Sequence, residues 1–483
     1  MGALTAVLNK RGADATETAI TMLAALSPAK TDNFGVASPS KAKIESTVDA
    51  LRNFHLNSDI IVGYRFSRIL QSDRPQPTRL KRAAMVFDGR IYPSNDTSFH
   101  ETLSAKPARD LVEVAGRFIR KSCGEYAFVL ADVGRVIAGR DPMGARPLYY
   151  GENDELAALA SEREALWRIG VNNDYSFPPG NVAVFSQTGS TLKPIKILSC
   201  SESKSITMEE AARKLEKLLR HSVKQRVSGL DEVAIGFSGG LDSCVVARLA
   251  QEAIGNVRLV HVSLEDQEET EHARNAADTL KLPIHVCVFK EEDVMKDLPM
   301  VLRIIEEDDP VKTAIGIPMY WAAWQASRMG FNIMLAGQGA DELFGGYRRY
   351  VDDYLLRGEE AVSKRIFQDV TRLCENNLER DSKICGFHGV ELRLPFATVE
   401  VAEFALSLPI NLKIDPEKAD ARKLVLRKTA ENMGLAESIV RRPKKAVQYA
   451  TGVNKTLKKL AKRQGSVKAF LQKEFRKVLA EAT

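Results

Sequence analysis

Cysteine is scarce in this chain, and its spacing excludes two kinds of cysteine-based structure. The six cysteines show none of the short paired spacings that a zinc cluster or a disulfide framework uses; they lie at positions 123, 200, 244, 287, 374 and 385. We therefore expect buried free thiols.

Long apolar runs are also missing. No uninterrupted apolar stretch reaches transmembrane length, and the N-terminus lacks the charged-then-apolar layout of a secretory signal. The apolar content of 44% and the charged content of 27% are those of an ordinary soluble protein. We expect a cytoplasmic protein of two or more domains, since 483 residues exceed the usual length of one domain.

A large excess of charge of one sign is absent too, except near the C-terminus. The net charge is only +6, but residues 451–483 hold nine Lys or Arg against two Glu. Such a basic tail could contact nucleic acid or another acidic surface. We favour the other interpretation, an amphipathic helix that packs its apolar residues inward, namely Leu460, Phe470, Leu471, Phe475 and Val478.

Two common phosphate-binding signatures are not present, although a glycine-rich turn is. The sequence SGGLDS at residues 238–243 follows the apolar run 233–237 and precedes a segment of helical periodicity. No Gly-Lys-Ser/Thr closes it, which excludes a Walker A loop, and the third glycine of a dinucleotide fingerprint is missing. A turn that only connects strand and helix is the weaker interpretation.

The composition of this turn suits an anion. Two glycines let the backbone approach a phosphate, and the following helix directs its positive end toward it. Asp242 would repel a bare phosphate, so its presence indicates Mg²⁺. The loop therefore predicts nucleotide chemistry.

The first part of the chain has the pattern of a sheet-rich domain. Short apolar runs alternate with turn signals, and two segments look helical, at 16–27 and 108–121. We predict an N-terminal α+β sandwich domain over residues 1–190. The polar residues 191–207 form the predicted linker.

The second part alternates between strands and helices, which predicts an α/β fold with a parallel sheet. After a helix over 208–227, the sequence predicts strands at 232–237, 258–263, 284–289 and 332–336, and helices at 241–254, 270–280 and 318–329. From about 350 the pattern is mainly helical. We place this domain at 208–450 and the basic helical tail at 451–483.

A second glycine-rich block follows a strand of the same predicted sheet. Residues 337–347 read GQGADELFGGY, so Asp341 and Glu342 come at the carboxyl end of that strand. Because ligands bind at the carboxyl ends of parallel strands, these carboxylates could share a metal with Asp242.

Four motifs together resemble the asparagine synthetase family. SGGLDS, GQGADELFGGY, HGVELRLPF at 388–396 and RRPKKA at 441–446 occur in the order and rough spacing of that family. The N-terminal part is similar to the family's class II glutamine amidotransferase domain, an Ntn-hydrolase-like sandwich, through stretches at 63–67, 87–92, 139–144 and 147–151. The resemblance spans residues 1 to about 450.

The resemblance implies an ATP-pyrophosphatase domain that adenylates a carboxylate. Its site residues would bind the phosphates and adenine of ATP; they are Ser238, Gly239, Gly240, Leu241, Asp242, Ser243, Val262, Gly337 and Gly339. Asp242 and Asp341 would hold Mg²⁺. Lys444 would stabilise the reacting phosphates, Lys423 is a weaker catalytic candidate, and Arg427 is expected to be structural.

The chain departs from the family at the glutaminase site. The family's nucleophile is an N-terminal cysteine, and Gly2 stands here instead, so no thioester can form. Asp88, before Gly89, replaces an asparagine, and its charge would oppose a developing oxyanion. Arg65, which matches a ligand of the glutamine carboxylate, would then be inherited structure. We expect a degenerate glutaminase site.

The chain departs from the family at a second position as well. Gln338 stands where asparagine synthetases have Glu and β-lactam synthetases have Tyr. A carboxamide cannot take a proton from an attacking amine, so either another base acts, such as Glu379 or Glu391, or the nucleophile differs. Glu306 and Asp309 lie where the family lines its substrate side, but they fit a solvated acidic run equally well.

The sequence thus predicts an ATP- and Mg²⁺-dependent ligase of the asparagine synthetase type. It would activate a carboxylate, aspartate first, and amidate it with ammonia that its own N-terminal domain does not make. The expected partners are small molecules, a second copy of the chain and a separate ammonia-supplying protein; neither nucleic acid nor membrane is expected. The alternatives are a ligase for a different carboxylate or amine, and a non-catalytic ATP-binding regulator.

Overall fold

The computed structural model describes residues 2–27, 29–92, 110–199, 205–418 and 421–482. The chain divides into two compact units, residues 1–197 and 198–483. Of the described helices, none is long and apolar enough to cross a membrane.

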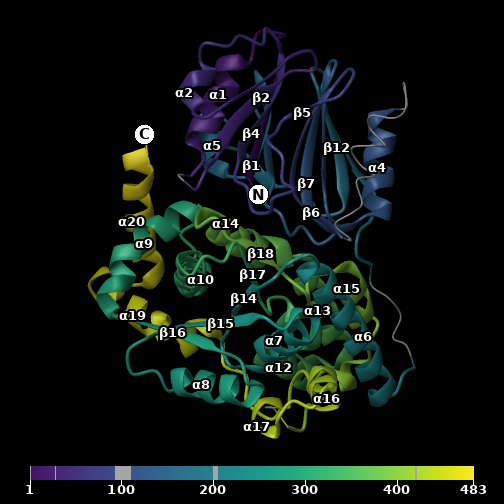
Figure 1. Ribbon diagram of the computed structural model, residues 1–483, viewed down its shortest axis with the longest axis vertical. Helices are drawn as coiled ribbons and strands as arrows, with labels where there is room; N and C mark the ends of the chain where they lie inside the picture. The colour runs from purple at the N-terminus through teal and green to yellow at the C-terminus, as the bar shows by residue number, and fades with distance from the viewer. Residues whose placement is uncertain (1, 28, 93–109, 200–204, 419–420, 483) are drawn as a thin grey trace. The chain divides into compact units, whose positions relative to one another are not determined.

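Two antiparallel sheets build the N-terminal unit (Figure 1). The first has the order β11 (Asp174–Ser176), β9 (Tyr149–Glu152), β10 (Leu156–Ala160), β1 (Gly2–Asn9), β4 (Ile60–Phe66), β2 (Asn33–Ala37) and β3 (Ala42–Glu45). The second has the order β13 (Gly189–Pro194), β12 (Asn181–Ser186), β8 (Arg135–Arg140), β7 (Cys123–Asp132), β6 (Ala84–Tyr92) and β5 (Thr78–Arg79).

The apolar faces of these two sheets pack against each other. Leu4 and Val62 of the first sheet share one buried cluster with Val129 and Phe185 of the second. The outer faces are covered by helices, which are α1 (Thr16–Ala25), α2 (Val48–Leu51) and α5 (Arg163–Trp167) on the first sheet and α4 (Leu111–Lys121) on the second (Figure 1). This confirms the predicted sandwich. Residues 108–109 of the predicted helix lie outside the described residues.

The C-terminal unit is built around a five-stranded parallel sheet. Its order is β16 (Ile284–Phe289), β15 (Val257–Leu264), β14 (Val233–Gly236), β17 (Ile333–Leu335) and β18 (Glu391–Arg393). Helices α7 (Leu241–Ile254) and α8 (Glu268–Leu280) pack on it, as do α9 (Glu291–Ile305) and α10 (Pro310–Arg328). The predicted α/β architecture is confirmed.

The remaining helices surround this sheet. They are α6 (Met208–Val227), α11 (Ala340–Phe344), α12 (Arg348–Arg357), α13 (Glu359–Thr371), the π-helical turn Cys374–Leu378, α14 (Glu379–Phe387), α15 (Val399–Leu406), α16 (Leu424–Asn432), α17 (Glu437–Val440), α18 (Val447–Ala450), α19 (Val453–Leu460) and α20 (Val467–Ala482). Two short 3-10 turns lie at Ile410–Leu412 and Ala461–Gln464. Residue Thr207 starts α6 with a capping box that it forms with Glu210.

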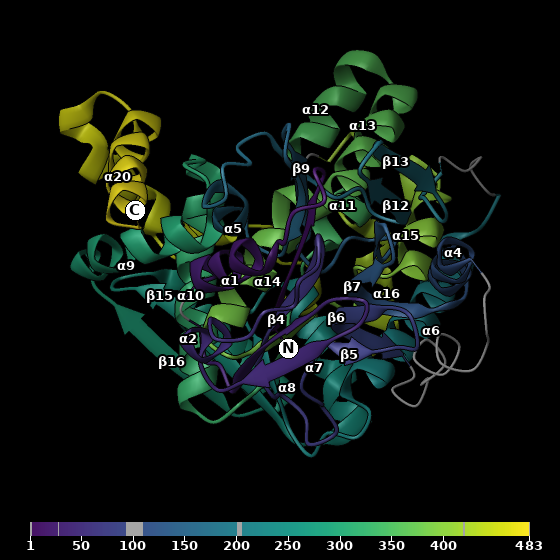
Figure 2. The same cartoon turned by 90° about the horizontal axis from the view of Figure 1, so that it is seen from above.

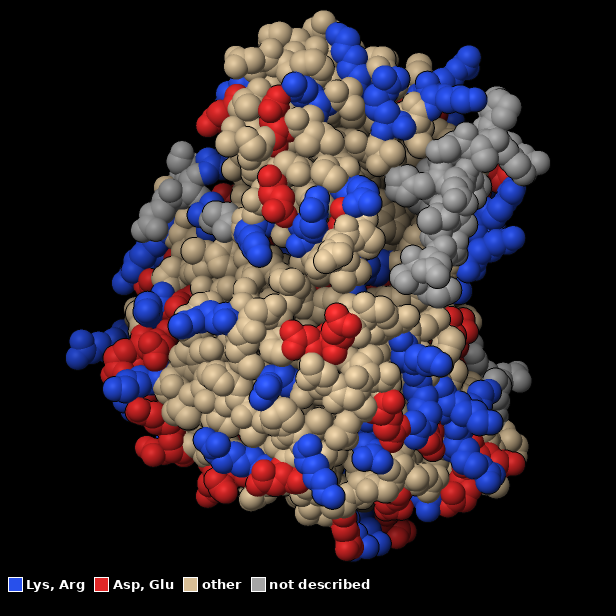
Figure 3. All heavy atoms as spheres, viewed as in Figure 1, with Lys and Arg blue, Asp and Glu red and all other residues tan. Residues whose placement is uncertain are grey.

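The basic C-terminal segment is part of the core of this unit. Phe470 and Leu471 are buried in one cluster with residues of α9 and α10, and α9 and α20 lie side by side (Figures 1 and 2). The amphipathic interpretation is confirmed for these inward residues. Basic side chains also gather elsewhere on this unit, over α6 (Figure 3), where the exposed ones are Arg213, Lys214, Lys217, Arg220 and Lys224.

Several predicted features differ from the structure. Residues 191–194, the start of the predicted linker, belong to strand β13 (Gly189–Pro194), all six residues of which are exposed. A strand with solvent on both faces leaves no apolar alternation in the sequence. Of the predicted buried thiols, Cys244, Cys374 and Cys385 are buried, while Cys123 and Cys287 are half-buried. Cys200 lies outside the described residues.

Candidate functional site

Strand order brings two glycine-rich loops together at the carboxyl ends of the neighbouring strands β14 and β17. The chain moves from β14 to β15 and β16 in one direction, then returns to β17 on the other side of β14. Ligands bind at such a switch point, beyond the carboxyl ends of the strands. The two loops touch here, because a Cβ added to Gly337 would lie 2.8 Å from the Cβ of Asp242.

The loop between β14 and α7 has the backbone of an anion cradle. Gly239 has a φ of +70°, and a Cβ there would lie 2.8 Å from the Cα of Ala273, so only glycine fits. The Ser243 hydroxyl donates to the Gly240 carbonyl at 3.0 Å. Helix α7 starts without a capping side chain, which leaves N–H groups of its first turn available for a phosphate.

Two carboxylates and two ammonium groups meet beside this cradle. Lys423 Nζ lies 2.6 Å from Asp242 Oδ2 and 2.6 Å from Asp341 Oδ1. Lys444 Nζ lies 2.6 Å from Asp341 Oδ2 and 3.8 Å from Asp242 Oδ2. We call these four residues the Asp–Lys cluster. Its formal charges sum to zero, so all four groups can stay ionised.

Attraction between the opposite charges outweighs the effect of burial on the pKa values of Asp341 and Lys444. Burial alone would raise the pKa of Asp341, but Lys423 and Lys444 outweigh it and hold this pKa well below its ordinary value. Burial alone would lower the pKa of Lys444, but Asp341 and Asp242 raise it above the ordinary value. Asp341 and Lys444 are therefore both ionised near neutral pH.

Lys423 is more central than the sequence suggested. Its side chain is only 3% exposed. It is the N-cap residue directly before α16 and has a φ of +58°. Arg427, one turn later, donates to the carbonyls of Arg422, Val440 and Arg442. These bonds tie the segment of Lys423 to that of Lys444, which gives Arg427 the structural role that the sequence predicted.

The segment that carries Lys444 is anchored on both sides of that residue. Arg442 pairs with Glu269 of α8 and donates to the carbonyl of Gly239 at 3.3 Å. Lys445 pairs with the same Glu269 at 2.8 Å. One buried carboxylate thus holds residues 442–445 against the loop of Gly239. No sequence signal distinguishes Glu269, which lies in an ordinary acidic first turn of α8.

Glu342 does not join the carboxylates that could share a metal. Its Oε1 accepts hydrogen bonds from the Tyr347 hydroxyl and from Asn377 Nδ2, both at 2.6 Å. Burial, then the nearby Asp341, raises the pKa of Glu342. Asp341 itself is closely enclosed, because a side chain at Gly346 would overlap its carboxylate.

Gln338 contacts a carboxylate that the sequence did not single out. Its Nε2 donates to Asp381 Oδ2 at 2.6 Å. The two bases suggested from the sequence lie elsewhere: Glu391 pairs with Arg393 inside β18 at 2.7 Å, and Glu379 is buried in α14. Asp381 sits in a helical stretch with no motif of its own, so only the fold brings it to Gln338.

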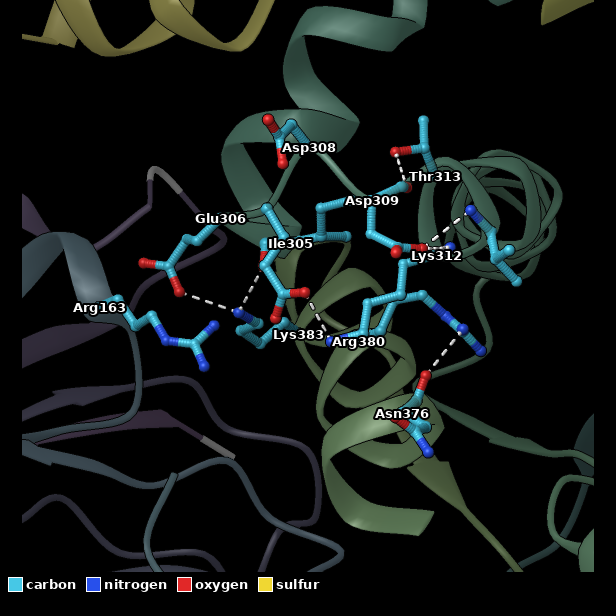
Figure 4. Close-up of polar contacts among 12 residues, drawn as sticks. Arg163, Ile305, Glu306, Asp308, Asp309, Lys312, Thr313, Asn376, Arg380 and Lys383 are labelled. Carbon is cyan, nitrogen blue, oxygen red and sulfur yellow. Dashed lines mark hydrogen bonds and ion pairs between the residues drawn. The ribbon is translucent and has the colours of Figure 1, made fainter. Parts of the chain in front are cut away.

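The acidic run before α10 serves local structure (Figure 4). Asp309 accepts from the N–H groups of Val311 and Lys312 and so caps α10. Glu306 lies 2.8 Å from Lys383 Nζ, which also donates to the carbonyl of Ile305 at 3.1 Å. Both carboxylates thus have structural partners. Val262 is buried on β15 among apolar residues of α9 and α10.

Position 2 of the N-terminal unit has no room for a side chain. A Cβ on Gly2 would overlap the carbonyl oxygen of Arg65 and lie 2.5 Å from the ring of Tyr64. Asp88 Oδ1 accepts from the Gly2 N–H at 3.0 Å and from the Tyr64 hydroxyl at 3.2 Å. At Gly89, whose φ is +128°, a side chain would overlap the carbonyl of Glu125.

Arg65 is engaged within the same unit. Its guanidinium lies 3.2 Å from Glu162 Oε1 and donates to the carbonyl of Ser27. The N–H of Ser27 donates to Glu162 Oε2 at 2.7 Å, and all three residues are buried. Arg65 and Glu162 thus form a buried ion pair within this unit.

Comparison with known proteins identifies the family. The asparagine synthase family matches residues 214–359 and 352–480, and a glutamine amidotransferase domain matches residues 64–168. A Methanocaldococcus jannaschii protein that carries the name of a glutamine-hydrolyzing asparagine synthetase is 35% identical over 74% of this chain and 75% of its own length. The chain belongs to the asparagine synthetase family. It is thus an enzyme of the carbon–nitrogen ligase class.

The chain is also similar to a plant asparagine synthetase and to a solved amidotransferase structure, both at lower identity. A glutamine-hydrolyzing asparagine synthetase from Asparagus officinalis is 26% identical over 79% of this chain and 68% of its own length. A glutamine phosphoribosylpyrophosphate amidotransferase structure from B. subtilis covers 59% of this chain and 81% of its own, with 15% identity and a TM-score of 0.32. A likeness that weak supports no conclusion.

Proposed function

We propose that this member of the asparagine synthetase family activates a carboxylate, with aspartate as the first candidate, as its acyl-AMP. Pyrophosphate leaves, and ammonia from outside the protein's own N-terminal unit then attacks the acyl carbon. The Asp–Lys cluster beside the SGGLDS loop carries this proposal. Lysine charges at that point would stabilise the negative charge that develops on the reacting phosphates.

ATP and Mg²⁺ fit the residues of this site. The N–H groups at the start of α7, with Ser238, Gly239, Gly240, Leu241 and Ser243, would hold the pyrophosphate portion. We assign Gly337 and Gly339 to the same site, where Gly337 packs directly against Asp242. Asp242 and Asp341 supply the oxygen ligands that Mg²⁺ prefers. No group of three or more metal-binding side chains occurs in the described part of the chain, so phosphate and water would complete the coordination.

We also propose that the N-terminal unit has lost its glutaminase activity. Gly2 offers no nucleophile and no space for one, Asp88 holds the Gly2 N–H, and Arg65 is paired with Glu162. We assign the amidotransferase-like domain to residues 1–190, the linker to 191–207, the ATP-pyrophosphatase domain to 208–450 and the basic helical tail to 451–483. Ammonia would come from solution or from a separate protein.

Two other functions compete with this one. A related ligase would use a different carboxylate or amine, and Gln338 favours it because an amide cannot serve as the base. A non-catalytic ATP-binding regulator is the second alternative. The intact Asp–Lys cluster counts against it, since burying four charges is costly for a protein that has no use for them.

Pyrophosphate exchange tests the proposal. Purified protein is assayed with ATP, Mg²⁺ and a panel of carboxylic acids, and amide formation is then measured with ammonia or glutamine as nitrogen source. We expect acid-dependent exchange, amide with ammonia and none with glutamine. Exchange with an acid other than aspartate supports the related ligase, and no exchange with any acid supports the regulator. Amide formation from glutamine alone would refute the loss of glutaminase.

A further inference from the structure

We propose that Asp381 fixes the orientation of the Gln338 amide, so that the Gln338 carbonyl oxygen accepts an N–H of the attacking amine. Gln338 then positions an uncharged nucleophile, and Asp381 is a positioning residue that acts through it. This inference rests on the proposed ligase function and adds to it the chemical state of the nucleophile.

The orientation of the amide follows from what a carboxylate can do. An ionised carboxylate only accepts hydrogen bonds, so the group that Gln338 turns toward Asp381 at 2.6 Å must be its NH₂. The carbonyl oxygen, Oε1, therefore points away from Asp381. Within the described residues no group hydrogen-bonds Oε1.

Asp381 is itself held in place. Arg380 Nε donates to its Oδ1 at 2.7 Å and Arg380 Nη2 to its Oδ2 at 3.0 Å. Arg380 Nη1 also donates to the carbonyl of Asn376 at 3.2 Å, within the π-helical turn that precedes α14. Asp381 is 0% and Arg380 3% exposed. Because Asp381 is buried and both of its oxygens accept from Arg380, the Gln338 amide has one low-energy orientation.

Gln338 lies where it can reach the reacting group. It follows Gly337, which packs against Asp242, and it comes directly after the carboxyl end of β17. Its side chain is half-buried, whereas Asp381 is wholly enclosed. Of these two residues, only Gln338 can therefore touch a substrate.

The Gln338 carbonyl oxygen can accept a hydrogen bond but cannot take a proton from the amine. It therefore suits an amine that is already uncharged. The nitrogen lone pair forms the C–N bond, the acyl C–O bond to AMP breaks, and its electron pair leaves on the phosphate oxygen of AMP. The surplus proton on nitrogen passes to water, because an amide does not take it. The buried Asp381–Arg380 pair is neutral as a unit, so it offers no net charge that would favour an ammonium ion.

Exchanging the donor and the acceptor tests this arrangement. In Asp381→Asn, an amide whose carbonyl keeps the bond from Arg380 Nε places its NH₂ where Oδ2 accepted from Arg380 Nη2 and Gln338, so it gives up the Nη2 bond and forces Gln338 to present its own NH₂ to the nucleophile. We expect the KM for the amine to rise about tenfold, the cost of one misplaced hydrogen bond, while pyrophosphate exchange changes less than twofold. The double variant Gln338→Glu with Asp381→Asn restores an acceptor and should restore the amine KM.

The outcomes are distinct. An unchanged amine KM in Asp381→Asn, or no recovery in the double variant, overturns the inference. If Asp381→Asn also loses exchange, recovery of both activities in the double variant supports the inference, and failure to recover overturns it. Absence of exchange in the unaltered protein would instead refute the proposed ligase function, so the two failures cannot be confused.

Discussion

At the scale of single residues, the candidate site depends on compensation of charge. Asp242 and Asp341 would repel each other and any phosphate, and Lys423 lies between them within 2.6 Å of each. Lys423 is almost fully buried, whereas the Lys444 side chain is 24% exposed. The two lysines therefore differ in what their removal should do.

We expect Lys444→Ala to lower pyrophosphate exchange by about 100-fold with little loss of stability, because it removes a charge that faces the reacting phosphates. Lys423→Ala should lower exchange and also cost about 3 kcal/mol of unfolding free energy, since it leaves two enclosed carboxylates with one cation. Exchange assays and urea unfolding measure both effects. The exposed Lys455 gives the control, Lys455→Ala, and full exchange by Lys444→Ala would contradict the assigned role.

His388 should make stability depend on pH. Its Nε2 is buried and has no hydrogen-bond partner among the described residues, its ring packs on Tyr320, and burial lowers its pKa to about 4. The unfolded chain, with a histidine pKa near 6.5, takes up the proton first. The stability that the uncharged His388 side chain contributes is therefore present in full above about pH 6.5 and is lost as the pH falls toward 4.

Urea unfolding at a series of pH values measures this loss, which we expect to be on the order of 2 kcal/mol. His388→Phe keeps an aromatic ring and should flatten the profile between pH 6.5 and 4. The exposed His221 gives the control, because His221→Gln should leave the profile unchanged. The same slope in His388→Phe and in the unaltered protein would assign the loss to other groups.

At the scale of elements, the sequence predicts the helices and strands that a local pattern of apolar and turn residues defines. Both glycine-rich loops follow apolar runs directly, and these runs are β14 and β17. Helix α9 and strand β18 are two of the elements that the sequence did not predict, each for a physical reason. Helix α9 has Pro299 in its interior, where the sequence signals a break, and β18 is only three residues long. Asp381 and Glu269 could not be predicted because their partners lie 43 and 173 positions away.

The contact between α8 and residues 442–445 leads to a prediction at this scale. Glu269→Gln should weaken the ion pairs with Arg442 and Lys445, so that Lys444 is held less firmly beside Asp341. We expect the KM for ATP to rise about fivefold, with a small change in melting temperature. Glu268→Gln removes a neighbouring exposed carboxylate and is the matched control. Equal effects of the two variants would refute a specific anchor.

At the scale of the whole molecule, the two units differ in how their polar groups are used. In the N-terminal unit, Asp88 and Arg65 are paired with groups of the same unit where a glutamine site would be. In the C-terminal unit, the N–H groups at the start of α7 have no capping side chain, and Lys444 stays partly exposed. The loss of glutaminase that we propose is compatible with this fold, because a sandwich with a packed core stays stable without a working site.

At the same scale, the apolar residues of the C-terminal segment complete a core that begins at β15. Leu471 is 0% exposed in one cluster with Val301 and Trp321, whereas Leu479 is 37% exposed on the same helix. Leu471→Ala should cost about 3 kcal/mol of unfolding free energy through transfer and cavity terms, and Leu479→Ala less than about 1 kcal/mol. Urea unfolding compares them. Equal small losses would show that α20 is dispensable to the core, and the nine basic residues of the segment 451–483 would then need a partner to explain them.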